Sequence, residues 1–167
     1  LTQKGIIGFP LFIDPLIMYW NRDLFQDARI SSAPKYWNEV IDNVPSLTVK
    51  DSSFNITQSA IALGDFRNVR NAKEILWTLI MQAGNPVVSR NAEDGLDVTL
   101  SGKLGLSYNP SHAALNFYAQ FANPARDLYT WNRSLTNDRD LFAAGDLSMY
   151  LGFASEVNRI RAQNPNL

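Results

Sequence analysis

The chain has 167 residues, of which 46% are hydrophobic and 19% charged, and its 15 basic and 16 acidic side chains leave a net charge of −1. This size and composition are typical of one globular domain and exclude a disordered chain. The balanced charge, with no basic run, excludes a nucleic acid or an anionic membrane surface as the partner.

Metal-ligating and nucleophilic residues are scarce in this sequence. It has no cysteine, which excludes a disulfide framework, a thiolate metal site and a cysteine nucleophile. The one histidine, His112, cannot build a multi-histidine site and is expected at the surface or at a helix cap. We therefore expect neither a metal nor a cofactor. The start at Leu1, without a methionine or a signal peptide, suggests a piece of a longer protein.

Two apolar runs near the start predict strands. Residues 5–12 (GIIGFPLF) contain Pro10, so this strand is expected to bend or to lie at a sheet edge. Residues 16–20 form the second run, which ends at Asn21, a good N-cap for a helix over residues 22–27.

A helical pattern follows the loop at residues 31–34. It covers residues 36–43, and Pro45 is expected to end it. Residues 57–63 (TQSAIAL) are short and apolar, which predicts a buried strand that ends at Gly64.

The clearest helix of the sequence begins near Asn71 and ends at Gly84. Its apolar residues recur at the spacing of one helix face, namely Ala72, Ile75, Leu76, Leu79, Ile80 and Ala83. Residues 85–109 are polar and predict an irregular excursion, with a small hairpin around Ser101 and Gly102.

Four more elements are expected in the last third. Ser111 is predicted to cap a helix that Pro124 stops, and Asn137 a second helix that ends at Gly145. Residues 147–151 (LSMYL) alternate like a strand, and a last helix runs through Val157 and Ile160. Strands that alternate with several helices predict an α/β, helix-rich fold, with residues 1–167 forming one domain.

The familiar catalytic and phosphate-binding motifs are absent. The chain has no G-x-S-x-G, no G-x-x-x-x-G-K-[ST], no G-x-G-x-x-G and no H-E-x-x-H. A pair of carboxylates such as Asp14 and Asp65 would suit glycoside hydrolysis, but any chain with 16 acidic residues offers such pairs.

Polar and aromatic residues gather at the ends of the predicted strands and in one loop between helices. In open α/β sheets, ligands bind beyond the carboxyl ends of strands. Sugars suit this mixture, because aromatic rings cover their C–H faces while carboxylates and amides bind their hydroxyls. The alternative is that Trp131 and Phe153 are core aromatics. The candidate ligand-binding residues are Asp14, Asp65, Phe66, Arg67, Asn68, Trp131, Asn132 and Phe153.

Several motifs resemble those of the extracellular solute-binding proteins of family 1, the group of the maltose- and other oligosaccharide-binding proteins. They occur in the family's order over nearly the whole chain. They are residues 8–14 (GFPLFID), 18–25 (MYWNRDLF), 33–39 (APKYWNE), 74–84 (EILWTLIMQAG) and 141–149 (LFAAGDLSM), the last followed by Gly152 and Phe153.

The resemblance implies one lobe of a type II periplasmic-binding-protein fold. This lobe would be the larger of two, with the other lobe and the C-terminal return segment absent. Asp14 lies where the family's carboxylate meets sugar hydroxyls, and the loop 65–68 and Trp131 lie at ligand-contacting positions. Phe153 replaces the tryptophan that usually stacks on a sugar ring, which leaves the class of sugar open.

The implied function is reversible carbohydrate binding for an ABC importer, with no catalysis. The expected partners are a carbohydrate, held weakly by one lobe alone, and the membrane subunits of the permease. The expected location is extracytoplasmic, in the periplasm or at the cell surface, with the parent lipid-anchored or secreted. We also expect dimerisation or strand swapping of the fragment. The alternatives are a lobe that only contacts the permease and a carbohydrate-active enzyme domain.

Overall fold

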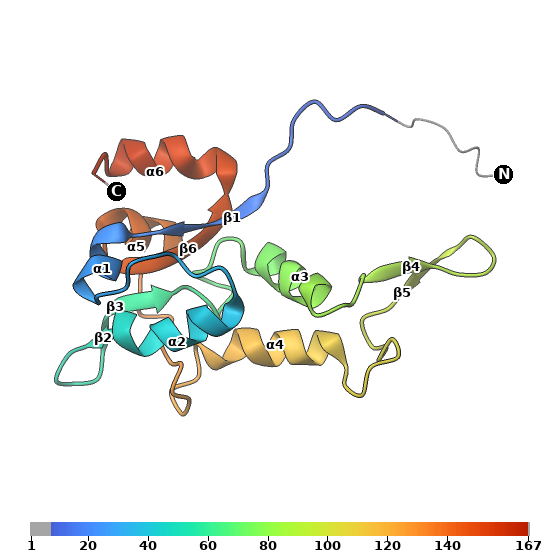
Figure 1. Ribbon diagram of the computed structural model, residues 1–167, viewed down its shortest axis with the longest axis horizontal. Helices are drawn as coiled ribbons and strands as arrows, with labels where there is room; N and C mark the ends of the chain where they lie inside the picture. Colours follow the sequence, from blue (N-terminus) through green and yellow to red (C-terminus); the bar gives the residue numbers. More distant parts are fainter. Residues whose placement is uncertain (1–7, 167) are drawn as a thin grey trace.

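The computed structural model describes residues 8–166. Four of the strands within that range form one sheet in the order β1-β6-β3-β2, and the other two form a separate hairpin (Figure 1). β6 runs antiparallel to β1 and parallel to β3, and β2 runs antiparallel to β3. The strands are β1 Leu16–Trp20, β2 Val49–Lys50, β3 Ile56–Ile61, β4 Val88–Arg90, β5 Leu96–Val98 and β6 Leu147–Phe153.

Helices cover both faces of this sheet and extend beyond it. The helical segments are α1 Arg22–Asp27, α2 Trp37–Leu47, α3 Ala72–Gln82, α4 Pro110–Gln120, α5 Asp138–Ala144, the 3-10 turn η1 Ala154–Glu156 and α6 Val157–Gln163. α3 and α4 pack against each other beside the sheet, and the β4–β5 hairpin projects from their far end (Figure 1).

The faces can be assigned from consecutive residues of β6. Tyr150 packs on Phe142 of α5, with ring centroids 5.7 Å apart. Leu151 points to the opposite face, where it shares a groove with Val40 of α2. The sheet therefore lies between α5 on one side and α2 on the other, which is a layered α/β arrangement.

The core is centred on β3, β6 and the chain that follows β3. A large apolar side chain that becomes fully buried contributes about 1.5–3 kcal/mol, so these positions dominate the stability. The alternating sequence of β6 predicts one buried and one exposed face. Because helices cover both faces of this strand, the residues on the second face are buried as well. The largest fully buried side chains are Trp131, Tyr150, Phe25, Phe121, Leu47, Ile61, Leu63, Ile75, Leu147 and Met149.

The predicted helix caps are confirmed where a side chain accepts hydrogen bonds from nearby backbone amides. Asn21 Oδ1 accepts from the amides of Asp23 and Leu24, at 3.0 and 3.2 Å, and so begins α1. Asn137 caps α5 in the same way, at 3.2 Å from the Asp140 amide. Gly145 follows α5 with a φ of +94°, a conformation that an L side chain rarely adopts.

Two predicted boundaries were wrong, one because long-range packing extends a helix and one because another residue caps a second helix. Pro45 does not end α2, which continues to Leu47, since Val44 and Leu47 are both fully buried. Asn109 caps α4 in place of Ser111, which lies one residue inside the helix. Its side-chain oxygen accepts from the His112 amide at 3.0 Å, and His112 itself is exposed, as expected.

The hairpin and the first strand also differ from the predictions. The hairpin turns at residues 91–95, where Asn91 Oδ1 accepts from the amides of Glu93 and Gly95, and not around Ser101. The part of the first predicted strand within residues 8–12 is an extended arm with no sheet partner, and its earlier residues lie outside the described range. Phe9, Leu11 and Phe12 are more than 80% exposed. Within residues 8–166, no helix is long and apolar enough to cross a bilayer.

Candidate functional site

The carboxyl ends of the two central strands meet at one edge of the sheet. β3 and β6 are parallel, so the loop that starts at Asp65 and the end of β6 at Phe153 lie at the same edge. β1 is antiparallel to β6 and begins at this edge, which places Asp14 beside Phe153. The arm of residues 8–14 also leaves from here (Figure 1). The candidate residues gather at this edge in two clusters.

Asp65 anchors the first cluster. Its Oδ2 accepts from Arg133 Nε at 2.7 Å, and its Oδ1 accepts from the Arg67 amide at 2.9 Å. Its backbone carbonyl accepts from the Tyr118 hydroxyl at 2.6 Å. Burial by itself would raise the pKa of Asp65, but the hydrogen bonds to its carboxylate and the charge of the Arg133 guanidinium outweigh burial and hold the pKa below its usual value. The carboxylate is therefore ionised and already paired.

Asn68 and Trp131 form the support beneath this loop. Asn68 Nδ2 donates to the carbonyls of Asn132 and Leu135 at 2.8 and 3.0 Å. Its Oδ1 accepts from Trp131 Nε1 at 2.9 Å. The Trp131 side chain is 0% exposed, so neither face of its ring is open to a ligand. Asn68 and Trp131 thus hold two loops together, and the core alternative describes Trp131 better than a stacking role.

Asn132 is half-buried and makes local contacts. Its Nδ2 donates to the Tyr129 hydroxyl at 2.8 Å, and its Oδ1 accepts from the amide and hydroxyl of Ser134. It stabilises the turn after Trp131.

Phe66 and Arg67 are the exposed members of the first cluster. The Phe66 ring is 72% exposed, and the Arg67 guanidinium carbon lies 5.8 Å from its centroid. An aromatic ring in water beside a cation offers a flat apolar surface and several hydrogen-bond donors. These two side chains are available to a ligand.

The second cluster joins the arm to the end of β6. Asp14 Oδ1 and Oδ2 accept from the amide and hydroxyl of Ser155, at 2.9 and 2.6 Å. Phe153 is half-buried, and its carbonyl accepts from the Tyr19 hydroxyl at 2.6 Å. Asp14 therefore fixes where the arm leaves the sheet, and each of its oxygens keeps room for a further hydrogen bond.

A buried polar network next to the second cluster was not predicted. Glu156 Oε2 accepts from the Tyr150 hydroxyl at 2.8 Å and from Arg139 at 3.3 Å, and its Oε1 accepts from the Phe153 amide at 2.9 Å. Asn71 Nδ2 donates to the same carboxylate at 3.3 Å. The one local signal was the spacing of Glu156, three residues after Phe153, which is that of a capping box.

The network and its neighbours have shifted pKa values. Burial would raise the pKa of Glu156, but its four donors outweigh burial and lower it. Burial raises the pKa of the Tyr150 hydroxyl strongly. It also raises the pKa of Asp138 to about 6, although the amides of Arg139 and Arg70 donate to that carboxylate.

The groups at this edge are hydrogen-bonded carboxylates together with an exposed aromatic ring and an exposed guanidinium. Among residues 8–166, no group of three or more His, Cys, Asp or Glu side chains could hold a metal ion. The carboxylates of Asp14, Asp65 and Glu156 are all hydrogen-bonded, Asp14 to Ser155, Asp65 to Arg133 and Glu156 to Tyr150. The exposed groups offer an aromatic face and polar hydrogens, which suit a neutral polar ligand held reversibly.

An apolar groove lies away from this edge. One part, of about 340 Å³, lies between α3 and α4, and a second, of about 380 Å³, lies beside β1 and α2. The two parts meet at Trp37, whose Nε1 donates to Gln82 Oε1 at 2.7 Å. None of the predicted site residues lines either part.

Comparison with known proteins places the chain in a family. Residues 1–167 match the model of the bacterial extracellular solute-binding proteins. None of the curated protein sequences matches the chain. A solved ABC transporter solute-binding protein from Thermotoga lettingae, bound with α-D-tagatose, superposes with a TM-score of 0.64 at 17% identity over 92% of this chain. CpMnBP1 with mannotriose bound superposes with a TM-score of 0.60 at 20% identity over 99% of it.

These solved structures share the fold of this chain. The chain spans 36% of the length of the first and 41% of the second. The predicted helix-rich α/β fold, a single lobe of a periplasmic binding protein, is confirmed.

Proposed function

Because this chain belongs to the bacterial extracellular solute-binding protein family, we propose that it is the carbohydrate-binding lobe of the substrate-binding component of an ABC importer. The observation that carries the proposal is that the candidate residues lie at the same edge of the sheet. This edge brings Asp14, the loop 65–68 and Phe153 together, and it exposes Phe66. The family is extracellular, and we place the parent in the periplasm or at the cell surface, with a lipid anchor or in secreted form.

The ligand we propose is a carbohydrate, most simply an oligosaccharide. Two fold neighbours were solved with sugars, α-D-tagatose in one and mannotriose in the other. The exposed groups at this edge have the chemistry that sugars need, because Phe66 can cover C–H groups while Arg67 and Asp14 bind hydroxyls. A second lobe would close over the ligand by a hinge. One lobe buries only one side of the ligand, so its affinity alone is low.

The predicted site residues divide into two roles in this proposal. Phe66, Arg67, Phe153 and Asp14 contact the ligand. Asp65, Asn68, Trp131 and Asn132 hold the loops that carry those contacts, because their polar atoms are paired and the Trp131 ring is buried. The permease contacts the lobe elsewhere on its surface.

We propose binding without catalysis. A glycosidase acid needs a raised pKa, whereas the Arg67 amide and the Arg133 guanidinium lower the pKa of Asp65 despite its burial. An aryl glycoside that the chain cleaves, with loss of turnover in Asp14→Asn and Asp65→Asn, would contradict this.

The test is a titration with mannobiose, mannotriose and a broader glycan panel, followed by saturation-transfer NMR, which detects weak complexes. Phe66→Ala should weaken binding by roughly three- to tenfold, since an aromatic contact contributes about 0.5–1.5 kcal/mol beyond its burial.

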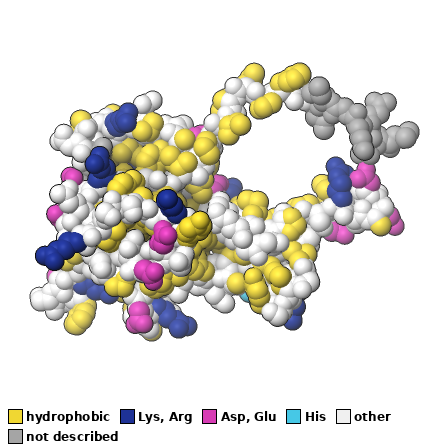
Figure 2. Space-filling view, viewed as in Figure 1, with side chains coloured by type: hydrophobic (Ala, Val, Ile, Leu, Met, Phe, Trp, Pro, Cys, Tyr) yellow, Lys and Arg dark blue, Asp and Glu magenta, His cyan; other side chains and the backbone are white. Residues whose placement is uncertain are grey.

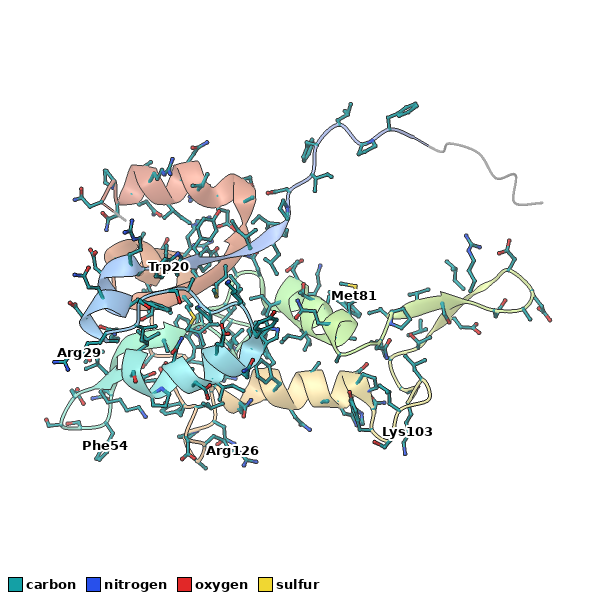
Figure 3. All side chains as sticks on the ribbon, viewed as in Figure 1. Trp20, Arg29, Phe54, Met81, Lys103 and Arg126 are labelled. Carbon is teal, nitrogen blue, oxygen red and sulfur yellow. The ribbon has the colours of Figure 1, made fainter. Side chains whose placement is uncertain are left out.

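The matched control is Phe54→Ala. Phe54 is 82% exposed, but it lies in the β2–β3 loop at the opposite end of the sheet (Figure 3). Equal affinities for wild type, Phe66→Ala and Phe54→Ala would contradict the placement of the site. No binding to any glycan by wild type would contradict the carbohydrate proposal itself.

A further inference from the structure

The ladder between the two central strands ends before it reaches the candidate site. Within residues 8–166, the last pair of the β3–β6 ladder is Ile61 with Met149. The loop 65–68 follows β3 beyond this pair, and Phe153 lies beyond it at the end of β6. Backbone pairing therefore does not set the distance between the two clusters of candidate residues, and side-chain contacts have to set it.

A buried carboxylate, that of Glu156, bridges the region beyond the ladder. Figure 2 shows charged side chains spread over the surface, whereas those of Glu156 and Arg139 are only 15% and 8% exposed. Glu156 Oε1 accepts from the Phe153 amide and from Asn71 Nδ2, at 2.9 and 3.3 Å. Its Oε2 accepts from the Tyr150 hydroxyl and from Arg139 Nη1, at 2.8 and 3.3 Å. One carboxylate thus joins the end of β6 to the starts of α3 and α5.

The start of α5 continues this connection to the other cluster. The Asp138 amide donates to the Asn68 carbonyl at 3.0 Å, and Asp138 Oδ2 accepts from the Arg70 amide at 3.0 Å. Asp138 is 1% exposed and directly precedes Arg139 in α5. Hydrogen bonds therefore connect the Glu156 carboxylate, through Arg139 and Asp138, to the loop that carries the first cluster.

The hydrogen bonds that the Phe153–Ser155 turn makes to β1 and the arm hold the turn from one side only. The Phe153 carbonyl accepts from the Tyr19 hydroxyl at 2.6 Å, and Ser155 donates to Asp14. These contacts fix the turn relative to β1. The contact with Glu156 is the one that relates the turn to α5 and, through α5, to the loop 65–68.

We propose that Glu156 is a positioning residue for carbohydrate binding, because its carboxylate holds the Phe153–Ser155 turn at a fixed separation from the loop 65–68. A ligand then contacts Phe66 of one cluster and Phe153 of the other at the same time. Glu156 itself does not contact the ligand, since each of its oxygens already accepts two hydrogen bonds. This inference rests on the proposed carbohydrate function.

Glu156→Gln shows the size of the expected effect. The variant keeps the shape of the side chain but replaces one acceptor oxygen with an NH₂ group, which present donors such as Arg139 would face. The turn then samples orientations in which only one cluster contacts the ligand. The apparent dissociation constant rises as the competent fraction falls, so a turn in position about 10–20% of the time weakens binding by about five- to tenfold.

The test is a glycan titration of wild type, Glu156→Gln and Tyr150→Phe, followed by ¹⁵N-HSQC. Tyr150→Phe removes one donor to the carboxylate but keeps the ring that packs on Phe142, so this variant retains the fold even if Glu156→Gln does not. It should weaken binding by about two- to threefold. In Glu156→Gln, the ligand-induced shifts of the Phe66 amide should persist at higher glycan concentration, while those of the Phe153–Ser155 turn shrink.

The matched control is Val44→Ala. Val44 is 1% exposed in α2, on the face of the sheet opposite α5, so the cavity that this variant creates destabilises the chain without touching the carboxylate. Its affinity for the glycan should equal that of wild type. An equal loss of affinity in Val44→Ala and Glu156→Gln would overturn the positioning role, because any destabilisation would then have the same effect.

Amide hydrogen exchange without ligand separates this inference from the proposed function. Glu156→Gln should speed exchange of the Ser155 amide by about fivefold or more, and Val44→Ala should leave it unchanged. An unchanged Ser155 rate in Glu156→Gln overturns the positioning role whether or not a glycan binds. Equal affinities of wild type, Glu156→Gln and Tyr150→Phe overturn it as well and leave the carbohydrate function standing. If wild type binds no glycan, the proposed function fails and the inference fails with it.

Discussion

Replacing Asn68 with alanine separates the ligand contact that the sequence analysis predicted for this residue from the supporting role that the structure indicates. In the structure its amide makes three hydrogen bonds, to the carbonyls of Asn132 and Leu135 and from Trp131 Nε1. If Asn68 holds the loops together, Asn68→Ala lowers the free energy of unfolding. If it serves mainly as a ligand contact, the variant loses affinity while its stability hardly changes.

The expected loss can be worked out from these contacts. Trp131 is completely buried, so its indole N–H keeps no alternative partner, and an orphaned buried donor costs about 1–3 kcal/mol. The two carbonyls each lose a hydrogen bond with a net value of about 0.5–1.5 kcal/mol. The sum is about 4 kcal/mol. For a chain of this size that corresponds to a fall in Tm of about 8–16 °C.

The assay is urea unfolding followed by tryptophan fluorescence, with Asn116→Ala as the control. Asn116 is exposed on α4, so its replacement should not lower stability. A loss below about 1 kcal/mol for Asn68→Ala would refute the supporting role, because it would mean that the Trp131 N–H is not orphaned.

Two further predictions concern the buried network and its surroundings. Gly152→Ala should destabilise the chain by about 1–3 kcal/mol, because the added Cβ would lie 2.8 Å from Tyr150 Cζ, and a thermal melt checks this. Asp138 has a folded-state pKa of about 6, above its ordinary value of 3.8, so its contribution to stability is complete below about pH 4 and is lost as the pH rises through 6. Relative to Asp138→Asn, wild type should therefore lose about 2 kcal/mol of unfolding free energy between pH 4 and pH 6, and a flat difference in urea titrations would contradict it.

Local signals predicted much of the fold. Asn21 and Asn137 cap helices by bonding amides two or three residues away, and Gly145 adopts a positive φ, so neighbouring sequence suffices for these boundaries. The end of α2 could not be predicted in this way, since it depends on the burial of Leu47. The hairpin also had a local signal, which is Asn91. The sequence analysis nevertheless placed the turn of the hairpin too far along the chain.

The candidate site was predictable only in part. The rule that ligands bind beyond the carboxyl ends of strands placed Asp65 and Phe153 at one edge, and the structure has them there. Asp14 lies at the same edge for a different reason, because it precedes the antiparallel β1 and does not follow the strand predicted at residues 5–12. The rule could not separate Trp131 from Phe66, because an aromatic side chain in a loop looks the same whether it is buried or exposed. The network around Glu156 joins residues far apart in sequence, and no single pattern predicts it.

The most direct test of the central claim is a ¹⁵N-HSQC map of the chain during titration with the glycan panel. The account predicts weak binding, with the largest shifts at Phe66, Arg67 and the Phe153–Ser155 turn, and none around Gln82 in the apolar groove. Shifts confined to that groove, or no shift at any glycan concentration, would contradict it.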